Sequence, residues 1–201
     1  MYMFDLKIMD FNIILLFSLI GACFCIKLSE GGKMISDYSF LFLLYSLYFL
    51  DYYWRDYTGD TIPNDALAGG YDADRRTTYI AQVLYENLLV PGEIRDAKAY
   101  FEYGFKQFEA TENVKILCTK HPKRFQWVIT TKDDFKTLTD KNFILGGYEP
   151  NNRIYIGRKS IGDMIIVGKV QVILPSLEAV FHYPRDGKGL FDYSYEVLTY
   201  L

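Results

Sequence analysis

An internal duplication is the feature of this sequence that most constrains its fold. Five short blocks recur in the same order in two stretches that begin at Trp54 and Trp127. The paired blocks are residues 69–72 and 146–149, 79–81 and 155–157, 90–94 and 167–170, 101–103 and 181–183, and 115–117 and 196–198. Two copies are too few for a long solenoid, which needs about three or more units. We therefore expect two tandem repeats, 51–118 and 125–201, related by a pseudo-twofold axis.

The local pattern within each copy is that of β-strands. Residues 77–83 and 153–158 alternate between the two faces of a strand and are rich in β-forming residues. Glycine pairs at 69–70 and 146–147 supply the backbone freedom that turns need. The predicted fold class is all-β, with four or five short strands per copy. Both copies would form one sandwich-like body, with a separate apolar segment before it.

That separate segment comprises residues 1–50. Its two apolar runs, 11–20 and 40–50, are both shorter than the roughly 18–20 residues of a membrane-spanning helix. The first run has the length of a signal-peptide core, so we expect a cleaved leader and a secreted protein. Two other interpretations stay open. A membrane-associated hairpin would give membrane contact through residues 1–50 only, and a stretch outside the working protein would allow a cytoplasmic location. In each case we expect these residues to pack poorly against the repeats.

Composition and motifs argue against several classes of function. The formal net charge is −3, from 22 Lys and Arg against 25 Asp and Glu, so no basic excess exists to neutralise nucleic-acid phosphates. The sequence contains no Ser-His-Asp or Cys-His set with supporting context, no glycine-rich phosphate loop and no zinc-ligand spacing. We therefore expect no enzyme activity, no cofactor, no metal and no nucleic-acid partner.

The repeated blocks carry a resemblance to the DM-nine repeat family, and it extends from Trp54 to Leu201. The second copy matches best, with Gly-Gly-Tyr at 146–148, Tyr-Ile-Gly-Arg at 155–158, Gly-Lys at 168–169 and Tyr-Glu-Val-Leu at 195–198. Such repeats occur in insect proteins, in bivalve mannose-binding lectins and in natterin-like proteins. The resemblance implies a lectin-like, non-catalytic protein.

The resemblance also implies which residues contact sugar. By position these are Asp72 and Glu93 in the first copy, and Glu149 and Lys169 in the second. A carboxylate accepts hydrogen bonds from sugar hydroxyls and an ammonium group donates them. Glu93 stands where the family has Lys, so Asp72 and Glu93 could instead bind a cation or be solvated. We expect Glu149 and Lys169 to face a common concave surface and to form the better sugar site.

Two functions from different classes therefore remain. The leading one is a carbohydrate-binding recognition protein for mannose-type glycans, with a role in innate defence. The alternative is a structural or protein-interaction module that kept the repeat fold and lost sugar binding. A homodimer is an assembly that the sequence leaves open.

Overall fold

The computed structural model describes residues 52–201, and the expected segment 1–50 lies outside the described residues. The first copy contains β1 (Tyr52–Tyr57), β2 (Ala68–Tyr71), β3 (Thr77–Tyr85), β4 (Leu88–Arg95), β5 (Lys98–Tyr103), β6 (Lys106–Ala110) and β7 (Val114–Thr119). The second contains β8 (Phe125–Thr131), β9 (Asn142–Phe143), β10 (Leu145–Glu149), β11 (Asn152–Ile161), β12 (Met164–Ile173), β13 (Glu178–Arg185), β14 (Lys188–Asp192) and β15 (Ser194–Tyr200). Two single-turn 3₁₀ helices, η1 (Pro122–Arg124) and η2 (Phe135–Thr137), lie beside β8. The all-β prediction is confirmed.

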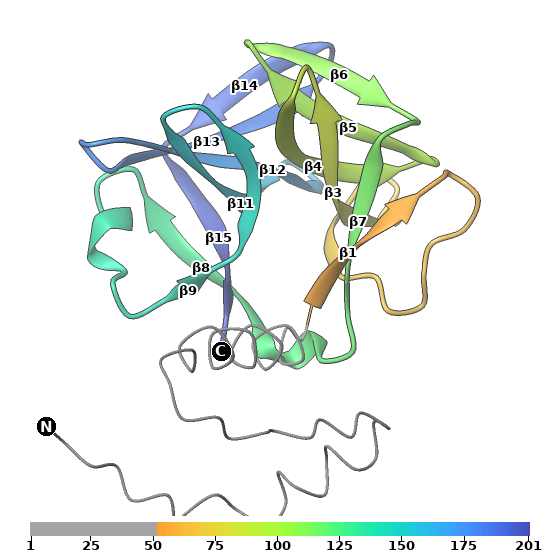
Figure 1. The fold of residues 1–201 in the computed structure, drawn as a ribbon, viewed down its shortest axis with the longest axis horizontal. Helices are drawn as coiled ribbons and strands as arrows, with labels where there is room; N and C mark the ends of the chain where they lie inside the picture. The colour runs from red at the N-terminus through yellow and green to blue at the C-terminus, as the bar shows by residue number, and fades with distance from the viewer. Residues whose placement is uncertain (1–51) are drawn as a thin grey trace, which may run out of the picture. The chain divides into compact units, whose positions relative to one another are not determined.

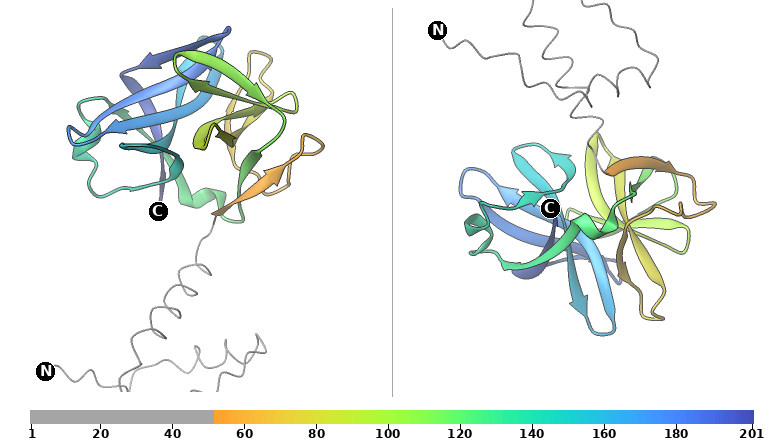
Figure 2. Two further views of the ribbon diagram at one scale, coloured as in Figure 1. Left: turned by 45° about the horizontal axis from the view of Figure 1, so that its top comes forward. Right: turned by 90° about the horizontal axis from the view of Figure 1, so that it is seen from below.

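The strands form one hydrogen-bonded sheet that curls into a barrel-like body (Figure 1). Its order is β1-β7-β3-β2-β12-β13-β14-β6-β5-β4-β10-β11-β15-β8, and β9 pairs with β15. When β1–β7 are exchanged for β8 and β10–β15, the order is the same read from the opposite end, which is the signature of a twofold relation. The two views of Figure 2 show the same division into an orange-to-green half and a teal-to-blue half.

The two copies exchange strands instead of packing as separate barrels. Strand β2 of the first copy pairs with β12 of the second, and β10 of the second pairs with β4 of the first. Strands β6 and β14 meet at Lys106 and Lys188, which occupy equivalent positions in their hairpins. Gln82 Nε2 donates to the Gly146 carbonyl at 2.8 Å, and Arg158 Nη1 donates to the Gly69 carbonyl at 3.3 Å. Each copy therefore completes the other.

The strand register corrects one of the expected block pairs. Glu93 lies opposite Tyr100, and Lys169 lies opposite His182. Tyr100 is therefore the counterpart of His182. Block 101–103 corresponds to residues 183–185, so the expected match, 181–183, begins two residues too early. The physical reason is the connection between β12 and β13, which is longer than the two-residue turn between β4 and β5.

The core has three parts, and the central one joins the copies. One cluster lies within the first copy and one within the second. The central cluster contains equivalent residues from both copies: Leu67, Ile80, Leu117, Ile144, Ile156, Val167 and Leu198. Five of these side chains are less than 1% exposed. Because neither copy can bury this cluster alone, we expect residues 52–201 to unfold as one unit. No helix among these residues is long and apolar enough to cross a membrane.

Glycine is required where the copies cross. A Cβ added at Gly147 would overlap the Leu89 carbonyl, and one added at Gly70 would overlap the Ile165 carbonyl. Both obstacles are backbone atoms, which cannot rotate away as a side chain can. The repeated Gly-Gly pairs are thus explained by the close approach of strands from different copies.

We expect Gly147→Ala to lower the free energy of unfolding by about 1–3 kcal/mol, because the new methyl group overpacks a backbone contact. Urea denaturation monitored by tyrosine and tryptophan fluorescence would measure the change. Leu145→Ala on the same strand is the control, because Leu145 is 60% exposed. Equal stability of Gly147→Ala and Leu145→Ala would contradict this account of the crossing.

Candidate functional site

Glu149 and Lys169 lie together, but inside the protein. Glu149 ends β10 and Lys169 lies in β12, and Lys169 Nζ donates to Glu149 Oε1 at 2.5 Å. Their side chains are 9% and 4% exposed. The expected pairing of a carboxylate with an ammonium group is present, whereas the expectation that both line an open concave surface is wrong. The two opposite charges pair with each other, and both side chains are at least nine-tenths buried.

Glu102 of the first copy completes this ion pair. It lies in β5, and its Oε2 is 3.3 Å from Lys169 Nζ, with a side chain only 3% exposed. Its other oxygen, Oε1, accepts a hydrogen bond from the Phe105 backbone N–H at 2.8 Å. The Lys169 ammonium also lies 5.3 Å from the centroid of the Tyr103 ring. The cation is therefore held between two carboxylates from different copies.

His182 is the fourth member of what we name the charged cluster: Glu102, Glu149, Lys169 and His182. Its Nδ1 is 3.9 Å from Glu102 Oε2. Burial, helped by the positive charge of Lys169, lowers the pKa of His182 to about 4, so the ring is neutral at pH 7. Within residues 52–201, neither Glu102 Oε2 nor His182 Nδ1 has a hydrogen-bond partner, although both are buried. Such atoms are uncommon in folded proteins and call for a specific explanation.

Sequence reasoning missed Glu102 and His182. Both belong to blocks that were recognised as repeated, but the block alignment set Glu102 against His182 as if they were equivalent. The register instead gives Pro184 as the counterpart of Glu102 and Tyr100 as that of His182. One signal was available, because Glu102 is a charged residue within an otherwise aromatic strand segment.

The first copy arranges its two predicted residues differently. Asp72 Oδ1 accepts backbone hydrogen bonds from Asp74 and Arg76, both at 2.9 Å, and Arg76 Nε lies 2.8 Å from Asp72 Oδ2. Burial opposes ionisation of Asp72, but these hydrogen bonds and the Arg76 charge outweigh it and lower its pKa. Asp72 therefore stabilises the turn formed by residues 72–76.

Glu93 is buried and not solvated, with only 2% of its surface exposed. Its Oε2 accepts a hydrogen bond from the Val167 backbone N–H at 3.1 Å, and Arg95 Nε is 3.7 Å from Oε1. Burial raises the pKa of Glu93 to about 7, although Val167 and Arg95 oppose the shift. The solvated interpretation of this pair is therefore wrong. No group of three or more His, Cys, Asp or Glu suited to a metal ion occurs within the described part of the chain.

The presence of Glu at position 93 goes together with a second difference between the copies, at positions 91 and 167. Gly69 and Gly146 are equivalent, and a Cβ on them would meet Val167 and Pro91 respectively. Val167 and Pro91 are therefore counterparts. Pro91 has no N–H, whereas Val167 has one, and that N–H is the donor that the Glu93 carboxylate accepts. Glu93 thus accepts a hydrogen bond from a backbone N–H that the counterpart residue, Pro91, does not have.

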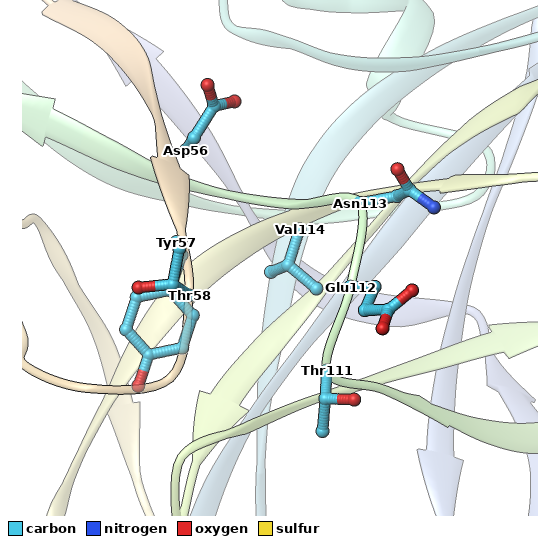
Figure 3. A pocket seen from close by; sticks show the side chains of 7 residues that line it. All are labelled: Asp56, Tyr57, Thr58, Thr111, Glu112, Asn113 and Val114. Atoms are coloured by element: carbon cyan, nitrogen blue, oxygen red, sulfur yellow. The ribbon is translucent and has the colours of Figure 1, made fainter.

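A shallow pocket of about 490 Å³ lies elsewhere, between the end of β1 and the β6–β7 turn (Figure 3). It is lined by Asp56, Tyr57, Thr58, Thr111, Glu112, Asn113 and Val114. None of the four predicted site residues lines it. The Asp56 and Glu112 carboxylates do not point toward each other in Figure 3, and Asp56 is paired with Lys115 at 2.9 Å. The pocket therefore brings no reactive groups together.

The fold and the charged cluster define a two-repeat, all-β module whose copies share their strands and core. The DM9 repeat matches residues 22–99 and 72–188, and the chain belongs to this family. Comparison with curated proteins gives no significant sequence match. Among solved structures, the fold is similar to the nematode sperm cell motility protein MFP2B, with a TM-score of 0.55 and 15% identity. The similarity covers 74% of this chain but only 46% of that one. At this identity the likeness concerns the fold alone.

Proposed function

We propose that the protein is a non-catalytic carbohydrate-binding module that recognises mannose-type glycans at the charged cluster. The observation that carries the proposal is that two buried atoms, Glu102 Oε2 and His182 Nδ1, have no hydrogen-bond partner within residues 52–201. A carboxylate oxygen accepts hydrogen bonds from sugar hydroxyls, and the nitrogen of a neutral imidazole accepts or donates one according to its tautomer. Membership of the DM9 repeat family supports this class of ligand.

The charge arrangement favours binding over catalysis. Lys169 is held by two carboxylates, and the pKa of His182 lies far below 7, so His182 is a poor proton-transfer group at neutral pH. The charged cluster is the proposed site, because neither Asp72 nor Glu93 of the first copy offers a buried atom that lacks a hydrogen-bond partner. Secretion and a role in innate defence belong to the same proposal.

A protein-interaction module that lost sugar binding is the second candidate. The observation that favours it is the closed geometry of both copies, in which all four family positions are at least nine-tenths buried. MFP2B is a motility protein that shares the fold, so this architecture also occurs in a protein named for motility.

Glu102→Gln tests the proposed site with little change of shape. It removes one charged acceptor and leaves Lys169 paired with Glu149, so we expect affinity for methyl α-mannopyranoside to fall by about 10- to 100-fold. Isothermal titration calorimetry measures the loss, and a thermal melt checks that the fold persists.

Leu84→Ala is the matched control, because Leu84 is 50% exposed on β3 of the first copy. It should bind like the parent. If the parent binds no mannoside, or if Glu102→Gln binds as tightly as the parent, the proposed function is wrong and the interaction module is favoured.

A further inference from the structure

A row of side chains leads from the charged cluster to the surface. Lys169 on β12 is directly opposite His182 on β13, and His182 is directly opposite Phe191 on β14. Directly paired residues of antiparallel strands have their side chains on the same face of the sheet. Exposure rises along the row: 3% for Lys169, 13% for the His182 side chain and 49% for Phe191. The row therefore changes from buried and charged to exposed and apolar.

Three exposed aromatic rings, one of them Phe191, lie at the outer end of this row. Phe105, Phe191 and Tyr193, which we name the aromatic platform, are 65%, 49% and 52% exposed. The Phe191 centroid lies 6.5 Å from that of Phe105 and 5.6 Å from that of Tyr193. His182 joins the platform to the charged cluster, with its ring centroid 6.3 Å from Phe105 and 6.2 Å from Phe191.

Phe105 lies in the two-residue turn between β5 and β6 and has a backbone conformation that glycine adopts more easily. Phe105 has φ +61°, a region that bulky residues rarely adopt. Its counterpart in the second copy is Gly187, with φ +76°, the residue that such a turn prefers. The chain thus keeps a strained phenylalanine where glycine would be easier, and leaves its ring largely in solvent. Strain of this kind is typical of functional positions.

The strained turn is held in place from two sides. The Phe105 N–H donates to Glu102 Oε1 at 2.8 Å, and the Phe105 carbonyl accepts from the Gly189 N–H at 3.0 Å. Glu102 therefore contacts the aromatic platform through one oxygen and faces Lys169 and His182 through the other. One carboxylate positions the exposed ring relative to the charged cluster.

We propose that the aromatic platform is a second sugar subsite, so that the ligand is an oligosaccharide of at least two hexopyranose units. This inference rests on the proposed function. One unit hydrogen-bonds with Glu102 and His182, and the next lays its C–H face on Phe105 and Phe191. A pyranose ring combines a hydroxyl-bearing edge with an apolar face. The charged cluster suits the hydroxyl groups, and the aromatic platform suits the apolar face.

The size of the platform favours a sugar over a protein partner. An aromatic side chain offers about 150–250 Å² of surface when fully buried. Three rings at roughly half exposure therefore present on the order of 300 Å², whereas a stable protein interface buries about 800 Å² on each partner. The Lys132 ammonium, 5.5 Å from the Tyr193 centroid, and the Lys159–Asp192 ion pair add charge at its edge.

Phe105→Gly separates the role of the ring from that of the fold. Glycine suits φ +61°, so the thermal midpoint should stay equal or rise, while affinity for linear mannotriose falls about three- to tenfold. Affinity for methyl α-mannopyranoside should be unchanged. Phe191→Ala should give the same split between the two ligands, and Leu84→Ala should change neither affinity.

The outcomes distinguish this inference from the proposed function. If the parent binds neither sugar, both are wrong. If the parent binds the monosaccharide, but Phe105→Gly and Phe191→Ala keep full affinity for mannotriose, only the subsite is wrong. A parent that sediments as a dimer, with Phe105→Gly monomeric and its mannotriose affinity unchanged, would instead make the platform a contact between copies and overturn the inference.

Discussion

Lys169→Met is expected to lower the free energy of unfolding by about 3–5 kcal/mol, because it leaves buried carboxylates without their cation. The Lys169 ammonium lies 2.5 Å from Glu149 and 3.3 Å from Glu102, and all three side chains are less than a tenth exposed. Methionine keeps the length of the lysine stem, so lost packing contributes little. Urea denaturation at pH 7 measures the change.

Two companion variants make this result specific to the charged cluster. Lys188→Met removes an exposed lysine and should leave stability within about 0.5 kcal/mol of the parent. Lys169→Met combined with Glu149→Gln should recover part of the loss, since one of the stranded carboxylates is then neutral. Equal stability of Lys169→Met and the parent would show that the buried ion pair is dispensable.

The stability effect also changes how sugar-binding variants should be interpreted. Truncation of Lys169 would weaken mannose retention simply by unfolding the protein, so its loss alone does not identify a ligand contact. Glu102→Gln and Phe105→Gly are more informative, because the first leaves Lys169 paired and the second suits its backbone. Binding and folding can then be measured separately.

The fold was predictable because its information lies in repeated local patterns. Alternating strand segments and Gly-Gly pairs recur in order, and the structure places equivalent residues on equivalent strands, with the Gly-Gly pairs inside β2 and β10 and not in turns. The repeated Gly-Gly pairs also have a structural reason that sequence reasoning did not reach. They lie at strand crossings between copies, where a Cβ would meet a carbonyl of the other copy.

The candidate site was only half predictable, because its other half depends on strand exchange. Glu149 and Lys169 could be selected by position within one repeat. Glu102 reaches Lys169 from the other copy, and His182 takes its place through the longer β12–β13 connection. Neither contact follows from residues close together in sequence. Burial of the charges was likewise invisible, because Asp and Glu after Gly-Tyr have the composition of an exposed turn.

Glu93 should make this protein less stable as the pH rises from about 4.5 to 7. The ordinary Glu pKa is 4.5, and burial raises the pKa of Glu93 to about 7 in the folded protein. Below pH 4.5 the carboxyl is protonated in both states. Between the two values the unfolded chain releases the proton while the folded protein retains it, so the free energy of unfolding falls with pH. Above pH 7 the loss is complete, and it amounts to about 3 kcal/mol.

Glu93→Gln removes this titration and should be more stable than the parent by about 3 kcal/mol at pH 8, but equal to it near pH 4.5. The amide oxygen of glutamine can still accept a hydrogen bond from the Val167 N–H.

His182 acts in the opposite direction, because its lowered pKa makes the folded state lose stability as the pH falls from 6.5 to about 4. Since His182 is present in both proteins, the difference between their urea-denaturation curves isolates Glu93. Glu112→Gln, which changes an exposed glutamate, is the control variant. A constant stability difference between Glu93→Gln and the parent across this range would contradict the raised pKa.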